Sequence, residues 1–241
     1  ITDRNGKVTK YEYDVHGRVT SKAIGTNKIS YTYFKDGNLK TITDSTGTTE
    51  RTYDALDRVT SKKVPGFGEC IYNYDIILDA NDGSVAEKST DPKGNVTTKV
   101  YDKAGRLWKV IADGKTTTYS YYDNGSVSTV EYSDHSKEVY TYYKDNLLKE
   151  LRNKRADGTD MDVYTYYYDA AHNISSKKEV INGTNKGETS YKYDVLNRLE
   201  KVTEPNGTTT TYTYDAAGNR KTETIVESST TTYNDYEYNN Q

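Results

Sequence analysis

A short motif, Tyr-x-Tyr-Asp-x-x-Gly-Arg followed by Val or Leu, recurs along the whole chain. Its clearest copies begin at Tyr11, Arg51, Val100, Tyr191 and Tyr212, looser copies begin at Tyr31, Tyr72, Tyr119, Tyr140 and Tyr164, and a half-copy begins at Tyr236. About ten copies, spaced roughly 20 to 27 residues apart, indicate a tandem array in which one supersecondary unit stacks on the next. We therefore expect residues 1–241 to form a single array, and the chain to be a fragment of a longer protein.

The motif positions are assigned a structural role, because their pattern predicts turns and strands and contains no catalytic signature. The residues so assigned are Tyr11, Tyr13, Asp14, Gly17, Arg18, Tyr53, Asp54, Arg58, Tyr101, Asp102, Gly105, Arg106, Tyr191, Tyr193, Asp194, Arg198, Tyr212, Tyr214, Asp215 and Gly218.

The residues before each motif Asp alternate in a way that predicts a strand. Before Asp215, one face would carry Thr208, Thr210, Tyr212 and Tyr214, and the other face Thr209, Thr211 and Thr213. Alternation in β-branched and aromatic residues is typical of a half-buried strand. A second strand should return after the motif and end in a variable turn such as Asn206-Gly207. One repeat is then one β-hairpin, successive hairpins form an antiparallel meander, and no helix is expected.

The motif Asp should open a type I turn, since Asp is favoured at the first position of that turn and Gly three residues later. A type I turn followed by a left-handed residue is a common hairpin connection, so the Gly position should have a positive φ. Where Gly is absent, the position holds Asp57, Asn146, His172 or Asn197. Asn, Asp and His are the other residues enriched at positive φ.

One repeat departs from the pattern after Tyr74 and Asp75. The chain continues there as Ile76-Ile77-Leu78-Asp79, and the next turn signal is Asn81-Asp82-Gly83. We expect an extended strand or a bulge at this place, with the turn displaced to residues 81–83.

The chain holds 26 tyrosines but only 2 phenylalanines. About twenty strands at ~4.8 Å spacing would make a ribbon on the order of 95 Å wide. Open sheets rarely exceed ~10 strands without curling, so the array should curl or spiral. Tyrosines at equivalent positions should form cross-strand ladders. Their hydroxyls favour a concave face beside a hydrated lumen, where they can bond to water or to backbone groups.

Composition excludes several kinds of function. The net charge of −3 offers no basic stripe for nucleic acid. No apolar run approaches the ~20 residues that span a bilayer. The single Cys70 cannot form an internal disulfide, and we interpret it as a packed thiol rather than a nucleophile. His16, His135 and His172 lie at expected turns without metal-ligand spacing, and neither a cofactor nor a metal is implied.

The repeated charged residues also favour structure over chemistry. The motif Asp occurs once per turn and lacks the alternating ligands of a calcium loop. The motif arginines begin return strands, and we consider their pairing with a carboxylate of a neighbouring repeat; they are Arg18, Arg58, Arg106 and Arg198.

The repeated Tyr-x-Tyr-Asp-x-x-Gly-Arg-Val/Leu resembles the YD repeats of the RHS family, which includes bacterial polymorphic toxins, wall-associated proteins, Tc toxin cocoon subunits and teneurins. The resemblance covers nearly the whole chain. It implies an all-β fold, a long antiparallel, curled or spiralling sheet that is a segment of a hollow β-shell. In toxin members the shell encloses a C-terminal toxic domain. Those members carry Asp-Pro motifs in a self-cleaving segment, but Asp91-Pro92 precedes a normal repeat, so this activity is not assigned to it.

Two functions follow from the resemblance and from the tyrosines. The first is a structural segment of a secreted or cell-surface shell that encloses or presents a covalently linked C-terminal toxin or effector domain. The second is an adhesion module that binds carbohydrates or cell-surface partners, because aromatic rings also stack on sugars. An enzyme is not expected, and neither a nucleic-acid partner nor a membrane span is expected.

Overall fold

The structure is a computed structural model that describes residues 1–79 and 83–238. These residues form 21 β-strands joined by turns, and no helix occurs among them, as predicted. It follows that the described residues contain no helix that could cross a membrane. The chain divides into two compact units, Ile1–Thr116 and Thr117–Gln241.

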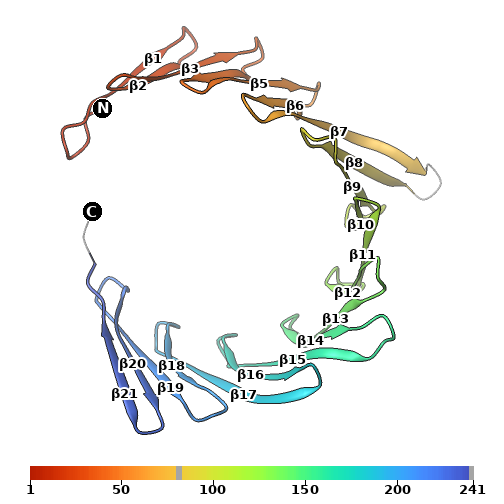
Figure 1. The fold of residues 1–241 in the computed structure, drawn as a ribbon, viewed down its shortest axis with the longest axis vertical. Coiled ribbons are helices and arrows are strands. Elements are labelled where there is room, and N and C mark those ends of the chain that lie inside the picture. The colour runs from red at the N-terminus through yellow and green to blue at the C-terminus, as the bar shows by residue number, and fades with distance from the viewer. Residues whose placement is uncertain (80–82, 239–241) are drawn as a thin grey trace. The chain divides into compact units, whose positions relative to one another are not determined.

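The first unit is an antiparallel meander in which every strand pairs with the next one along the chain. Figure 1 shows these hairpins following one another along a bent strip, coloured from red to yellow-green. The strands are β1 (Thr9–Tyr13), β2 (Val19–Ile24), β3 (Asn27–Tyr33), β4 (Leu39–Asp44), β5 (Gly47–Tyr53), β6 (Val59–Val64), β7 (Gly68–Asp79), β8 (Ser84–Thr90), β9 (Val96–Tyr101) and β10 (Leu107–Ala112).

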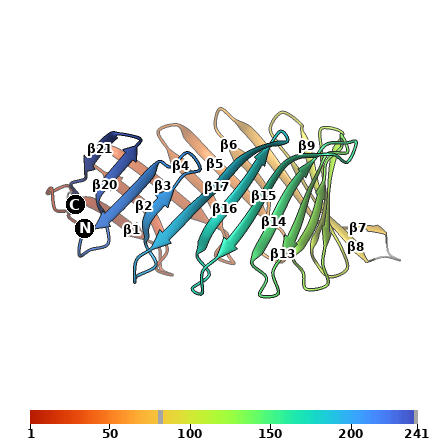
Figure 2. The ribbon, with the colours of Figure 1, turned by 90° about the horizontal axis from the view of Figure 1, so that it is seen from below.

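The second unit repeats this arrangement, again with consecutive antiparallel pairing. Figure 2 shows its strands β13 to β17 lying side by side. The strands, the first of which begins just before the unit boundary, are β11 (Lys115–Tyr121), β12 (Val127–Glu131), β13 (Lys137–Tyr142), β14 (Leu148–Lys154), β15 (Asp160–Tyr168), β16 (Ile174–Ile181), β17 (Thr184–Tyr193), β18 (Leu199–Thr203), β19 (Thr209–Tyr214), β20 (Arg220–Glu227) and β21 (Thr230–Asp235).

The sheet has two chemically different faces, as the alternation predicted. On β19, Tyr212 and Tyr214 are half-buried while Thr213 between them is exposed. The Thr213 hydroxyl shares a 2.7 Å hydrogen bond with the Thr222 hydroxyl on the facing strand. Full burial is rare, and the buried hydrophobic side chains of the described residues are Ala86, Val100 and Val130. The described strands form one hydrogen-bonded sheet, and cross-strand contacts supply much of its stability.

The predicted turn geometry is confirmed. All nine residues expected at positive φ have it: Gly17, Gly37, Asp57, Gly105, Gly125, Asn146, His172, Asn197 and Gly218. In the first copy the backbone amide of Gly17 donates to the carbonyl of Asp14 at 3.0 Å, which closes the turn. The turn expected at His135 is of the same kind: it spans 132–136, and His135 has a φ of 65°.

We expected an extended strand or a bulge in the irregular repeat, and the structure contains both. Strand β7 is 12 residues long, and its pairing with β8 shifts register between Asn73 and Ile76. Asp75 within this shift has a φ of 53°, and Gly83 before β8 has a φ of 70°. The expected turn residues Asn81 and Asp82 lie outside the described residues.

Candidate functional site

Each motif Asp closes its own turn with its carboxylate. One oxygen of Asp14 accepts hydrogen bonds from the backbone amides of His16 and Arg18, both at 2.9 Å. The other oxygen accepts from Nε of Arg18 at 2.7 Å. The bond from the Arg18 amide is the main reason that the pKa of Asp14 lies below its ordinary value. This carboxylate stays ionised and fully bonded, which suits a turn and leaves no free group for proton transfer.

The same three bonds recur at Asp54, Asp102 and Asp194. Their arginine partners are Arg58, Arg106 and Arg198. Each motif arginine thus pairs with the Asp of its own turn, a partner that was not expected, and the expected pairing with a neighbouring repeat's carboxylate is confirmed at Arg58. The four-residue turn places the Arg directly across from that Asp. Arg58 in addition reaches Asp75 of the next repeat at 2.6 Å.

The tyrosine that precedes the turn joins one hairpin to the hairpin before it. Its hydroxyl donates to the backbone carbonyl at the start of the preceding hairpin's return strand, at 2.7 to 3.1 Å. This backbone acceptor explains why tyrosine is preferred over phenylalanine here. The six donor and acceptor pairs are Tyr33 and Val19, Tyr53 and Leu39, Tyr74 and Val59, Tyr168 and Leu148, Tyr193 and Ile174, and Tyr214 and Leu199.

The ring of this tyrosine packs on the arginine of the preceding hairpin. The guanidinium carbon lies 4.6 Å from the ring centre for Arg18 over Tyr33, and 4.4 Å for Arg198 over Tyr214. Arg58 over Tyr74 has the same geometry at 4.4 Å. Because the guanidinium is fixed by its own Asp, it bridges two hairpins. The expected tyrosine ladder is therefore wrong at these repeats, since an arginine takes the place of the second ring.

In three repeats an aromatic residue stands at the position of the motif Asp. Its ring then packs on the tyrosine of the next hairpin, where the arginine guanidinium packs in the repeats described above. Phe34 meets the ring of Tyr53 edge to face at 6.0 Å, and Tyr143 meets Tyr168 at 6.1 Å. Tyr122 and Tyr142 form the third such pair, at 6.1 Å. The sequence carries a signal of this second arrangement, because Asp and Arg are lost together in Phe34/Asn38, Tyr122/Ser126 and Tyr143/Leu147.

One junction between hairpins leaves an open groove. It lies between the turn after β13 and the turn after β15 and has a volume of about 610 Å³. Nε2 of His172 lies 4.0 Å from the Asp145 carboxylate at this junction. Rings and polar groups thus face the same space, lined among others by Tyr143, Asp145, Leu147, Tyr167, Tyr168 and His172.

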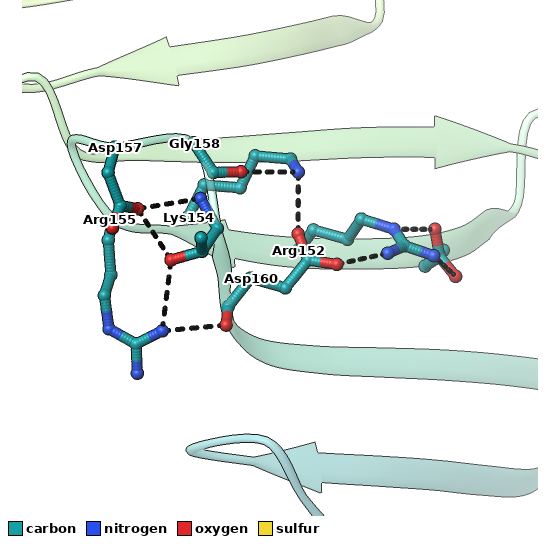
Figure 3. A network of polar contacts seen from close by, with 8 residues as sticks. Arg152, Lys154, Arg155, Asp157, Gly158 and Asp160 are labelled. Carbon is teal, nitrogen blue, oxygen red and sulfur yellow. Dashed lines mark hydrogen bonds and ion pairs between the residues drawn. The ribbon is translucent and has the colours of Figure 1, made fainter.

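The opposite edge carries a charged network between β14 and β15 (Figure 3). The Arg152 guanidinium donates to Asp160 at 2.5 Å and to Glu150 at 2.6 and 2.9 Å. Lys154 donates to the second oxygen of Asp160 at 2.7 Å, and the Arg155 side chain donates to the Asp160 carbonyl at 2.9 Å. The bond from Lys154 is the main cause of the lowered pKa of Asp160. The network ties the ends of two adjacent strands together.

The remaining chemically reactive residues lie apart from one another. His16, His135 and His172 lie in turns, and Cys70 is a half-buried free thiol on β7. Within residues 1–79 and 83–238, no three His, Cys, Asp or Glu side chains gather as metal ligands would.

The tyrosines whose pKa values are raised predict sensitivity to alkali. Burial raises the pKa of Tyr168, and a hydrogen bond to Glu138 together with burial raises the pKa of Tyr132 to about 12. Because these folded-state values lie above the unfolded value of about 10, the tyrosines stabilise the fold fully below that pH. This stabilisation is lost as the pH rises through the folded values. We expect the unfolding free energy to fall above about pH 10 as tyrosinate absorbance appears. Equal stability on both sides of that pH would contradict this expectation.

Two segments of the repeat array match models of known protein families. Residues 193–232 match the RHS Repeat model, and residues 1–77 match the Teneurin YD-shell model. A search of curated protein sequences found no match. Two solved structures share the fold with a TM-score of 0.73 over 95% of this chain: TcdB2-TccC3 at 16% identity, and the Photorhabdus luminescens Tc holotoxin pore at 17%. This chain spans 15% and 14% of those chains.

Proposed function

Because the chain belongs to the RHS/YD-repeat family, we propose that it is a wall segment of a secreted or cell-surface shell. The shell encloses or presents another domain, a toxin or effector that is covalently linked on the C-terminal side. The observation that carries this proposal is that the motif side chains bond to each other and to the neighbouring hairpin. Asp194 and Arg198 bond to each other, Arg198 packs on Tyr214, and Tyr214 bonds to the backbone of the preceding hairpin. These contacts join one hairpin to the next, which is what a wall requires.

Electron cryomicroscopy of the intact protein that contains this chain tests the proposal. We expect the strip of residues 1–241 to form part of a wall around density for a second domain. Limited proteolysis should then cleave that domain only after the wall is opened by denaturant. Intact protein in which the appended domain is cleaved at once, with the strip standing apart from it, would overturn the proposal.

A second function is supported by the groove beside Tyr143. Its tyrosine rings could stack on a sugar, and Asp145 and His172 could bond to its hydroxyls. If the chain is a carbohydrate-binding adhesion module, a glycan array should retain specific sugars. Binding should be lost in Tyr167→Ala, because Tyr167 lines the groove and is 38% exposed. It should persist in Tyr233→Ala, which removes a tyrosine that is 72% exposed on β21. Absence of any retained glycan, or equal loss in both variants, would remove this function.

A further inference from the structure

The motif turns lie along one edge of the sheet, here called the motif edge, and at this edge two positions can meet across successive hairpins. The first is the residue that follows the positive-φ position of one turn, here called the outgoing residue. The second is the positive-φ residue of the next turn, called the receiving residue. Three pairs of short polar side chains bond in this way: Asn38 to Asp57 at 2.6 Å, Ser126 to Asn146 at 2.6 Å, and Asn173 to Asn197 at 3.0 Å.

At two turns the outgoing residue is Arg and the receiving residue is Gly, whereas Arg58 pairs with Asp75 of the irregular repeat, which has a φ of 53°. Arg18 is followed by Gly37, and Arg198 by Gly218. The guanidinium of Arg18 is turned toward Asp14 and the Tyr33 ring, and it also donates to the Phe34 carbonyl at 3.3 Å. A Cβ at Gly37 would lie 4.0 Å from Nη1 of Arg18, an ordinary van der Waals distance, and a Cβ at Gly218 would have nothing within 4 Å. Only a side chain longer than alanine would therefore compete with the guanidinium of Arg18.

The opposite edge carries a second kind of pair, made of glycine and proline. The chain has 3 prolines, and each covers a glycine of the preceding hairpin. A Cβ at Gly47 would lie 2.8 Å from Cβ of Pro65, a Cβ at Gly68 2.8 Å from Cβ of Pro92, and a Cβ at Gly187 2.5 Å from Cβ of Pro205. Carbon atoms that are not bonded do not approach so closely, so each proline requires glycine beneath it.

We infer that these paired positions form a neighbour-selecting code. At the turns that carry such pairs, an edge accepts a following hairpin only if its residues are complementary: Gly after Arg, Asn or Asp after a short polar residue, and Pro over Gly. Hairpins of one backbone shape could otherwise stack in the wrong order or register, or pair with another chain through an open edge. Mismatched pairs add repulsion that discriminates against those arrangements. The inference concerns assembly of the wall and holds for either function proposed above.

A mutant cycle at Gly187 and Pro205 tests the code on the full chain. Hydrogen exchange of the amides in β16 to β19 is the readout, because it reports local opening even if the array does not unfold in one step. Gly187→Ala should speed exchange at least about tenfold more than Gly183→Ala. Gly183 is the matched control, because its φ is +73° and nothing lies within 4 Å of its Cβ position. In a Pro205→Gly background, Gly187→Ala should cost no more than this control. An equal penalty with and without Pro205 would overturn the code at this edge.

The motif edge is tested without replacing any glycine, in case Gly187→Ala prevents folding. Asn173→Arg and Asn197→Gly each create a mismatch, whereas the double variant recreates the Arg-to-Gly pair. Asp169 occupies the motif Asp position of this turn and would pair with the new arginine. Tyr193 of the next hairpin would supply the ring on which that arginine packs. We expect the double variant to exchange at least about threefold more slowly than the two single effects combined would give. Additive effects would overturn the code at the motif edge.

Discussion

Replacing Tyr168 with alanine is expected to destabilise the second unit by about 2–3 kcal/mol, because it removes a half-buried ring and a hydrogen bond between hairpins. Tyr168 packs edge to face on Tyr143 and donates its hydroxyl to the Leu148 carbonyl at 2.9 Å. Tyr168→Phe keeps the ring and should cost only about 1 kcal/mol. Urea unfolding followed by circular dichroism measures both changes.

Tyr233→Ala is the matched control for this prediction. Tyr233 lies on β21 of the same unit and is 72% exposed. Its loss should change stability by less than about 0.5 kcal/mol. Equal effects of Tyr168→Ala and Tyr233→Ala would show that the contact between hairpins contributes nothing measurable.

Val100→Asp is expected to unfold the neighbourhood of β8 to β10, at a cost above about 3 kcal/mol. Val100 is 2% exposed, and it lies opposite Ala86, which is 0% exposed, and Lys109. An aspartate at this position would be buried without water or a hydrogen-bonding partner in either its ionised or its protonated form, and both forms are unfavourable there. Loss of amide protection in β8, β9 and β10 is the measurement.

Val96→Asp provides the comparison on the same strand. Val96 starts β9, four residues before Val100, and is 44% exposed. A carboxylate at this position can remain in water, so protection of β8 to β10 should be nearly unchanged. If both substitutions remove protection alike, burial at Val100 is not what stabilises this part of the sheet.

The local geometry of each hairpin could be predicted from the sequence. The substitution of Gly by Asp57, Asn146, His172 or Asn197 indicated a positive φ, and all four residues have one. Strand alternation likewise predicted the tyrosine face. Both features depend on residues close together in the chain, where propensity and periodicity act directly.

Contacts between hairpins were harder to predict. Arg198 packs on the ring of Tyr214 in the following hairpin. The Tyr214 hydroxyl donates to the Leu199 carbonyl in the preceding hairpin, 15 residues earlier in the chain. Such pairs depend on the register of three strands and on the turn lengths between them. The fit of Pro205 over Gly187 depends on the same geometry. The sequence shows that Phe34 and Tyr143 replace the motif Asp. That each of them packs edge to face on a tyrosine of the next hairpin could be seen only in the structure.

The central claim is that tyrosine hydroxyls join successive hairpins. The most direct test replaces by phenylalanine the six tyrosines that donate to a preceding hairpin's carbonyl: Tyr33, Tyr53, Tyr74, Tyr168, Tyr193 and Tyr214. The control replaces Tyr13, Tyr31, Tyr119, Tyr164, Tyr191 and Tyr233, whose hydroxyls make no hydrogen bond found among the described residues. At about 1 kcal/mol per bond, the first variant should lose several kcal/mol of unfolding free energy in urea and the control little. Equal unfolding of the two variants would contradict the claim.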